Sequence, residues 1–444
     1  MPGLATKSGR EWHRGQARTG HSGSLMSWLK VPFLVLATGL AALVAASADF
    51  EFFGFSASGY AWLLPLVAAL LVLARYPTRV HFPIWIWVPW ALLLLAYLTQ
   101  AEEPHAMQRT VMMLCPLAVG MAASCVRATP TVALATLRFV KPLAVALLLA
   151  VVWGTGLLLS GTLPSYGGYA ASVMTVSLLG AVFAAEYSSG RRASLIWWGA
   201  IQLVPLIALT RTGIVASALT LPLCLGRVRL RTRLISLGAI ALGGIALFSS
   251  PRMQARMFYS GSGTFSDMSL QNRNFATSGR SALWPELVEE IKKRPWLGHG
   301  ANASETYVST ARPGLAHPHN DWLRLLYDYG VLGTVLFVLT LLTQVFHTLA
   351  SARRAPDPAH VLFIGVASSF IVLTLFMFTD NIILYAAFFG NLQFAFLGTA
   401  YGSTSRRKKV RSLAEPIGSH VLPDHPTRIN TNGKLVRGSS DSFR

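Results

Sequence analysis

Apolar runs of about 16 to 28 residues recur along the chain and are separated by short polar segments. As helices, runs of this length cross the hydrocarbon core of a bilayer. The pattern predicts an all-α polytopic integral membrane protein with about twelve transmembrane helices. We place these helices at residues 28–48, 58–75, 82–99, 108–126, 140–160, 165–186, 193–210, 212–226, 232–250, 321–349, 359–379 and 381–402.

One long polar segment, residues 251–320, lies between the ninth and tenth predicted helices. We expect it to form one large periplasmic loop with short helices and to contain the catalytic groups. The remaining parts are a basic cytoplasmic N-terminal tail, the two sets of transmembrane helices and a basic C-terminal tail that is expected to be disordered. Their bounds are 1–27, 28–250, 321–402 and 403–444.

The composition excludes a soluble globular protein, because 53% of the residues are hydrophobic and only 13% are charged. The net charge of +20 does not indicate nucleic acid as a partner, since the basic residues lie between apolar runs and at the termini. Cys115, Cys125 and Cys224 lie in or beside apolar runs and show no metal-binding spacing. We therefore expect no cofactor, no metal and no disulfide framework.

Basic residues gather in alternate segments between the predicted helices, which allows the orientation to be assigned. If the N-terminus is cytoplasmic, the inner segments are arginine-rich and most short outer loops are acidic or neutral. The protein is then a multi-pass protein of the bacterial inner membrane, with its active site on the periplasmic side. Because ATP is absent from the periplasm, a reaction there needs a substrate that carries its own activation.

Within the loop, residues 280–293 are predicted to form an amphipathic helix. Trp284, Leu287, Val288 and Ile291 recur on one face at helical spacing. Pro285 lies inside this pattern and either delays or kinks the helix. We expect the helix to close a cavity at the membrane surface.

Two arginines are candidates for binding an anion. Arg211 stands between two apolar runs at the outer membrane face, where a charge needs water, headgroups or a partner. Arg280 opens the loop helix, and free backbone N–H groups beside a guanidinium would suit a phosphate. The plainer interpretation of Arg211 is an arginine whose side chain reaches the lipid headgroups, and that of Arg280 is a solvated loop arginine.

The end of the loop contains the candidate base. His317 and His319 flank Pro318, and Asn320 is a plausible cap for the helix that follows. A neutral imidazole can accept a proton from a hydroxyl group, so one of these histidines is a candidate for activating an acceptor hydroxyl. His317, Asn320 and Arg312 are candidates for substrate binding. The alternatives are ordinary surface histidines, a role for His317 limited to shaping the turn, a solvating role for Arg312, or a His-x-His metal site.

The segment His319-Asn320-Asp321-Trp322-Leu323, continuing to Tyr329-Gly330 and Gly333, resembles the signature of the O-antigen ligase and polymerase superfamily. Ser278-Gly279-Arg280, Pro295-Trp296-Leu297-Gly298-His299-Gly300 and Arg211-Thr212-Gly213 resemble further motifs of this family. The resemblance implies a metal-independent glycosyltransferase that takes a glycan from undecaprenyl diphosphate. It assigns Arg211 and Arg280 to the diphosphate and His319 to the acceptor.

The acceptor would be lipid A–core oligosaccharide for a ligase of lipopolysaccharide biosynthesis, and a second lipid-linked glycan for a polymerase. We favour the ligase, because the predicted loop around Arg211 is only a turn. Membrane lipids are the other expected contacts, and we expect a monomer. No carboxylate stands out as a nucleophile, so the sequence favours one inverting step. O-antigen or exopolysaccharide polymerases, and a lipid or solute transporter, are the alternatives.

Overall fold

The computed structural model describes residues 31–47, 51–52, 55–99, 101, 105–125, 129–163, 166–269, 271–277, 279–384 and 389–404. The predicted N-terminal tail and residues 405–444 lie outside this part of the chain. The described elements up to residue 201 are α3 (Phe33–Ala46), β1 (Glu51–Phe52), β2 (Phe55–Ser56), α4 (Ala57–Tyr60), α5 (Leu63–Arg75), η1 (Pro77–Arg79), η2 (Ile84–Ile86), α6 (Val88–Leu98), α7 (Ala106–Cys125), α8 (Pro130–Leu159), α9 (Gly168–Ser188) and α10 (Ser194–Ile201). After them come α11 (Leu203–Ala208), α12 (Arg211–Leu219), α13 (Leu230–Phe248), α14 (Pro251–Met257), η3 (Phe265–Asp267), α15 (Arg280–Lys293), α16 (Ala303–Ala311), α17 (Asp321–Ala352), α18 (Asp357–Phe376), η4 (Ile382–Leu384) and α19 (Gly390–Thr404).

The fold is helical apart from one short antiparallel pair, β1 with β2. Six helices are long and apolar enough to cross a membrane, namely α7, α8, α9, α13, α17 and α18. Shorter apolar helices accompany them, including α3, α5, α6 and the α10–α11 pair. These lengths and compositions are those of a multi-pass membrane protein. The count of twelve spans and the orientation of the ends stay predictions.

Helix bounds differ most from the predicted ones at three places. α8 begins at Pro130 and not at residue 140, because proline is favoured at the first position of a helix. α12 ends at Leu219 and not at 226, just before Pro222, which cannot continue the hydrogen-bond pattern. α19 begins at Gly390 and not at 381, because a polar turn and η4 precede it. In each case a local signal overrode the hydropathy pattern.

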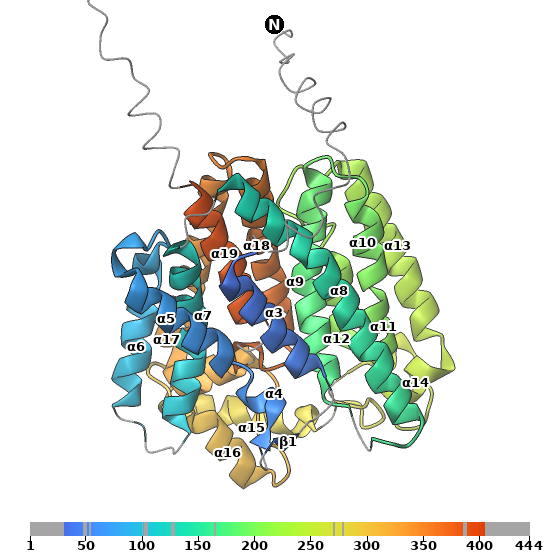
Figure 1. Ribbon diagram of the computed structural model, residues 1–444. Coiled ribbons are helices and arrows are strands. Elements are labelled where there is room, and N and C mark those ends of the chain that lie inside the picture. The colour runs from blue at the N-terminus through green and yellow to red at the C-terminus, as the bar shows by residue number, and fades with distance from the viewer. Residues whose placement is uncertain are drawn as a thin grey trace, which may run out of the picture. The chain divides into compact units, whose positions relative to one another are not determined.

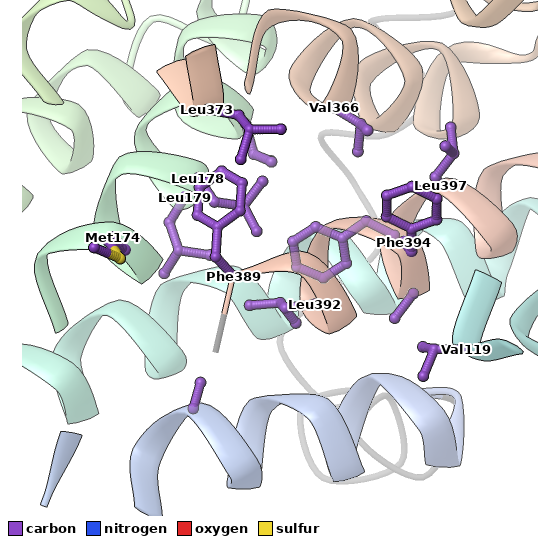
Figure 2. Packing of buried hydrophobic residues seen from close by; sticks show 14 of the residues in the cluster. Val119, Met174, Leu178, Leu179, Val366, Leu373, Phe389, Leu392, Phe394 and Leu397 are labelled. Carbon is purple, nitrogen blue, oxygen red and sulfur yellow. The ribbon is translucent and has the colours of Figure 1, made fainter. Parts of the chain in front are cut away.

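The core lies where α7, α9, α18 and α19 pack together. Figure 2 shows apolar side chains from these helices directed toward one another, among them Leu178, Leu373 and Phe394. Small residues let the backbones approach closely. A Cβ on Gly398 of α19 would lie only 2.2 Å from the carbonyl oxygen of Gly120 on α7. Close packing of this kind holds the scaffold on which the loop helices rest.

The loop helices α15 and α16 lie together at one end of the bundle (Figure 1). The predicted helix over 280–293 is confirmed as α15, with Pro285 inside it. Its buried face differs from the predicted one. Leu283, Leu287 and Ile291 pack with Val308 of α16, whereas Val288 is 38% exposed. The helix is therefore rotated relative to the prediction, because it packs against α16 and α17 together.

A break divides α17 at Gly330, whose φ of 65° and ψ of −170° are not helical. The backbone of the loop segment before α16 fills this break. Val331 and Leu332 donate their N–H groups to the carbonyls of Pro295 and Trp296, at 2.8 and 3.2 Å. The predicted tenth span is thus two helical pieces, and the first of them, residues 321–329, begins immediately after the candidate base.

Candidate active site

Arg211 is the first residue of α12, after a tight turn in which Leu209 adopts a left-handed conformation (φ 49°). Its Nη2 donates to the carbonyl oxygen of Ala276 at 2.9 Å, and its guanidinium carbon lies 5.3 Å from the ring centroid of Phe275. Nη1 is buried and has no hydrogen-bond partner in the described part of the chain. The loop segment therefore orients this guanidinium and leaves one buried donor for a ligand.

Arg280 begins α15 after the left-handed Gly279 (φ 82°). Its Nε is buried without a partner among the described residues, and burial lowers the pKa of the guanidinium while the Asp380 carboxylate opposes this shift. The prediction of free backbone N–H groups at this helix start is wrong, because the first three N–H groups already have acceptors; that of Ala282 donates to the carbonyl of Gly279 at 3.3 Å. The N–H groups of Arg280 and Ser281 already donate to Thr277, at 3.2 and 3.3 Å. Ser278 lies outside the described residues.

The two arginines line one cavity of about 580 Å³. Their charges are close enough to repel each other. The other walls are mostly apolar side chains of α12, α13 and α14, with Trp284 and Thr379 beside the arginines. α13 lies at the edge of the bundle in Figure 1, and its most apolar stretch is not buried by the protein. The cavity thus has an apolar interior and two cations on its wall.

His319 lies in a strained turn that several elements hold in place. Its φ is 50°, a left-handed value that is uncommon for residues other than glycine. Asn320 Oδ1 accepts the N–H of Leu323 at 3.0 Å, which confirms the predicted helix cap. Trp284 of α15 donates its indole N–H to the carbonyl of Pro318 at 2.9 Å. The loop helix that contains Arg280 therefore also fixes the turn that contains His319.

Asp380 is a candidate functional residue that the sequence reasoning missed. Its Oδ1 lies 3.8 Å from Nδ1 of His319, and its charge acts on Arg280. The neighbouring Thr379 hydroxyl donates to the hydroxyl of Thr212, next to Arg211, at 2.7 Å. This turn therefore lies near all three candidate groups: it contacts His319 and Thr212, and its charge acts on Arg280. The sequence did contain a signal for Asp380: it is a carboxylate between two apolar runs, on the same side of the membrane as that predicted for the loop.

His317 contacts a different part of the structure. Its Nδ1 lies 3.1 Å from Oε1 of Glu305, which also contacts Arg109 at 3.2 Å and the fully buried Arg324 at 3.1 Å. Burial raises the pKa of Glu305, but the contact with His317 and the Arg324 charge outweigh it and lower this pKa to about 2. Glu305 is therefore a stable anion that anchors the histidine turn to α16, α17 and α7.

Arg312 does not join the other two arginines. It forms an ion pair with Glu286 of α15 and does not line the cavity of about 580 Å³. Of the predicted substrate-binding residues, Arg211 and Arg280 come together, whereas His317 and Asn320 have structural partners of their own. Within the described residues, no three His, Cys, Asp or Glu side chains gather as a metal site would require. The ring of His299 stacks on Tyr327 with ring centroids 4.3 Å apart.

The fold and this arrangement define a multi-pass membrane protein with a cationic, partly apolar site at one end of its helix bundle. Comparison with known families identifies the class. Residues 195–338 match the O-antigen ligase family, which confirms the resemblance seen in the motifs. The matched segment runs from α10 into α17 and contains Arg211, Arg280 and His319. Asp380 lies beyond it.

Three curated proteins are similar to parts of the chain. The exopolysaccharide production protein ExoQ of Rhizobium meliloti is 24% identical over 268 residues, which cover 54% of this chain and 58% of ExoQ. The O-antigen ligase of Pseudomonas aeruginosa is 36% identical over 61 residues, 14% of this chain and 15% of the ligase. An uncharacterised protein of Haemophilus influenzae is 24% identical over 119 residues, 24% of this chain and 30% of that protein. The chain thus aligns with less than two thirds of each relative.

Proposed function

We propose that the protein is a glycosyltransferase that moves a glycan from undecaprenyl diphosphate to a sugar hydroxyl at the periplasmic face of the inner membrane. The observation that supports this most is the cavity shared by Arg211 and Arg280. A polyprenyl diphosphate combines a long apolar chain with a compact multiple anion. The cavity combines apolar walls with two guanidinium groups, each of which has a buried nitrogen without a partner in the described chain.

The proposed chemistry is charge stabilisation of a leaving diphosphate together with general-base catalysis. Arginine suits the first task, because its guanidinium stays charged and can donate two parallel hydrogen bonds to phosphate oxygens. His319 suits the second. Its Nδ1 lies 3.8 Å from Oδ1 of Asp380, a carboxylate that favours the tautomer protonated at Nδ1, and this leaves Nε2 for the acceptor hydroxyl. Asp380 would orient the ring and stabilise the imidazolium that forms.

The reaction is proposed as one displacement. The acceptor oxygen forms a bond to the anomeric carbon as the bond from that carbon to the diphosphate oxygen breaks. The hydroxyl proton moves to Nε2 of His319, and the carrier leaves as undecaprenyl diphosphate held by Arg211 and Arg280. One displacement inverts the anomeric configuration. Asp380 supplies a carboxylate near the site, so the competing double displacement through a covalent intermediate has a candidate nucleophile. A product linkage of retained configuration would favour that route.

Ligase and polymerase remain two proposals within this reaction class. The ligase is favoured by the tight turn before Arg211, which leaves no second large outer loop in that place. The polymerase is favoured by the similarity to ExoQ, an exopolysaccharide production protein, because this similarity covers a larger share of the chain than that to the O-antigen ligase. The glycan profile of a deletion strain separates them. Long polymer left on the carrier lipid indicates a ligase, and acceptor capped with a single repeat indicates a polymerase.

Alanine variants in that strain test the site. Arg211→Ala, Arg280→Ala and His319→Ala should each abolish restoration of the wild-type glycan profile at normal protein level. Arg273→Ala serves as the matched control, because this loop arginine is exposed and does not line the cavity. Wild-type profiles from the His319 variant would refute the assigned base. An equal loss of the wild-type glycan profile in the Arg273 variant would show that activity depends on the positive charge of the loop in general and not on the arginines of the cavity.

A further inference from the structure

A second cavity, of about 810 Å³, lies apart from the one that contains Arg211 and Arg280, and the two share no lining residue. It is formed by the loop segment 294–301, by Ala303 at the start of α16 and by the end of α6. Arg294, Trp296, His299 and Tyr97 contribute its side chains with hydrogen-bonding or aromatic groups. The proposed transfer reaction assigns no role to any of them.

The walls of this cavity are held in place before any ligand binds. The hydroxyl of Tyr97 donates to the carbonyl of Leu297 at 2.6 Å. The backbone N–H of His299 donates to the carbonyl of Tyr327 at 2.8 Å, and the His299 ring stacks on the ring of Tyr327 at an interplanar angle of 18°. Gly298 packs directly on the break in α17, where a Cβ would lie 2.6 Å from the carbonyl of Asp328. A ligand would therefore bind to a preformed surface, and binding would order few additional protein groups.

Two side chains project from this fixed backbone, and no structural contact accounts for their presence there. Trp296 is 64% exposed, although burial of an indole is strongly favourable. Arg294 is exposed and forms no ion pair with the described residues. An aromatic face, a guanidinium and an imidazole around a concave surface are suited to a sugar. The indole packs on the apolar C–H face of a pyranose, while the cationic N–H groups donate to hydroxyl or carboxylate oxygens.

We propose that this cavity binds the acceptor glycan, several sugars away from the reacting hydroxyl. The inference rests on the proposed function and extends it. α16 connects the two places: Ala303 lines the cavity, and Glu305, two residues later, contacts His317 in the histidine turn. The arginine cavity is connected to the same turn through Trp284 of α15, which lines that cavity and donates to the carbonyl of Pro318. In this proposal an acceptor chain that rests on Trp296 reaches the histidine turn along α16, whereas the donor lipid lies in the separate cavity beside α15.

Binding is tested apart from transfer. The probe is the lipid-free oligosaccharide released by mild acid from the lipopolysaccharide of the source bacterium, titrated calorimetrically into the purified protein. The wild type and Arg273→Ala, whose exposed arginine lines neither cavity, should bind it with equal Kd. Trp296→Ala should weaken the binding about tenfold, as expected for loss of a stacking surface. Trp153→Ala is the matched control, because this tryptophan of α8 is 70% exposed and remote in sequence from the cavity; its Kd should be unchanged.

Steady-state transfer supplies a second readout. Trp296→Ala should raise the KM for acceptor about tenfold, with kcat and the KM for donor unchanged. Saccharide binding without any transfer by the wild type would contradict the proposed function and leave the cavity assignment standing. Transfer with an unchanged acceptor KM and an unchanged Kd in Trp296→Ala would overturn the cavity assignment. In that case Trp296 would be an anchor in the membrane interface.

Discussion

The break in α17 requires a glycine at one position, Gly330. Its φ of 65° and ψ of −170° fall in a region that is essentially restricted to glycine. A Cβ there would also lie 2.3 Å from the carbonyl oxygen of Trp296 and 2.7 Å from the N–H nitrogen of Gly298. The backbone strain alone costs about 1–3 kcal/mol. Both close atoms are backbone and cannot rotate away, so Gly330→Ala should destabilise the fold by about 3 kcal/mol or more.

Thermal unfolding of the detergent-purified protein measures this effect. The control is Gly243→Ala in α13, where an added Cβ would meet no atom within 4 Å. Alanine is favoured over glycine in a helix by roughly 1 kcal/mol, so this control should be as stable as the wild type or slightly more stable. Transfer activity should fall only in Gly330→Ala, because residues 321–329 follow the His319 turn directly. Equal stability of the two variants would refute the proposed packing of the loop into the break.

Three further substitutions test the surroundings of the site. Glu305→Gln removes one of the two carboxylates that pair with the buried Arg324, together with the ionic contact to Arg109, and should cost about 3 kcal/mol at neutral pH in denaturant unfolding. Because the pKa of Glu305 is lowered from 4.5 to about 2, this contribution is complete above pH 4.5 and disappears as the pH falls toward 2, where variant and wild type should converge. Asn320→Ala removes a helix cap and should cost about 1 kcal/mol in the same assay. Asp380→Asn should lower kcat for transfer by about 100-fold or more with little change in donor KM, and an unchanged kcat would remove Asp380 from the site.

Much of the fold could be predicted from hydropathy, because membrane-crossing helices need long apolar runs and such runs are easily recognised. Every predicted span overlaps a helix in the described part of the chain. The errors arise where a local signal acts against hydropathy. Pro222 ends α12 early, and Gly330 divides an apolar run into two helices. Hydropathy averages over a window and therefore does not register a single residue that changes the backbone conformation.

The site could be predicted only through ionisable residues that are conspicuous in the sequence, because they lie next to apolar runs or at the start of a predicted helix. Arg211 and Arg280 are 69 positions apart in sequence, yet the turn before α12 and the start of α15 bring both to one cavity. Asp380 was missed because its partners come from other elements, and sequence spacing contains no information on such pairs. Arg312 was selected on residue type alone. Its ion pair with Glu286 depends on the packing of α15 against the end of α16, which the sequence does not reveal.

The central proposal is that this chain transfers a glycan from a polyprenyl diphosphate by means of two arginines and a histidine. The most direct test is transfer by the purified protein in lipid nanodiscs, with undecaprenyl-diphosphate-linked glycan as donor, lipid A–core as acceptor and a chelator present. We predict a ligated product of inverted anomeric configuration with the wild type and with Arg273→Ala, and none with Arg280→Ala or His319→Ala. Undiminished ligation by the His319 variant, or loss of ligation on chelation, would contradict the proposal.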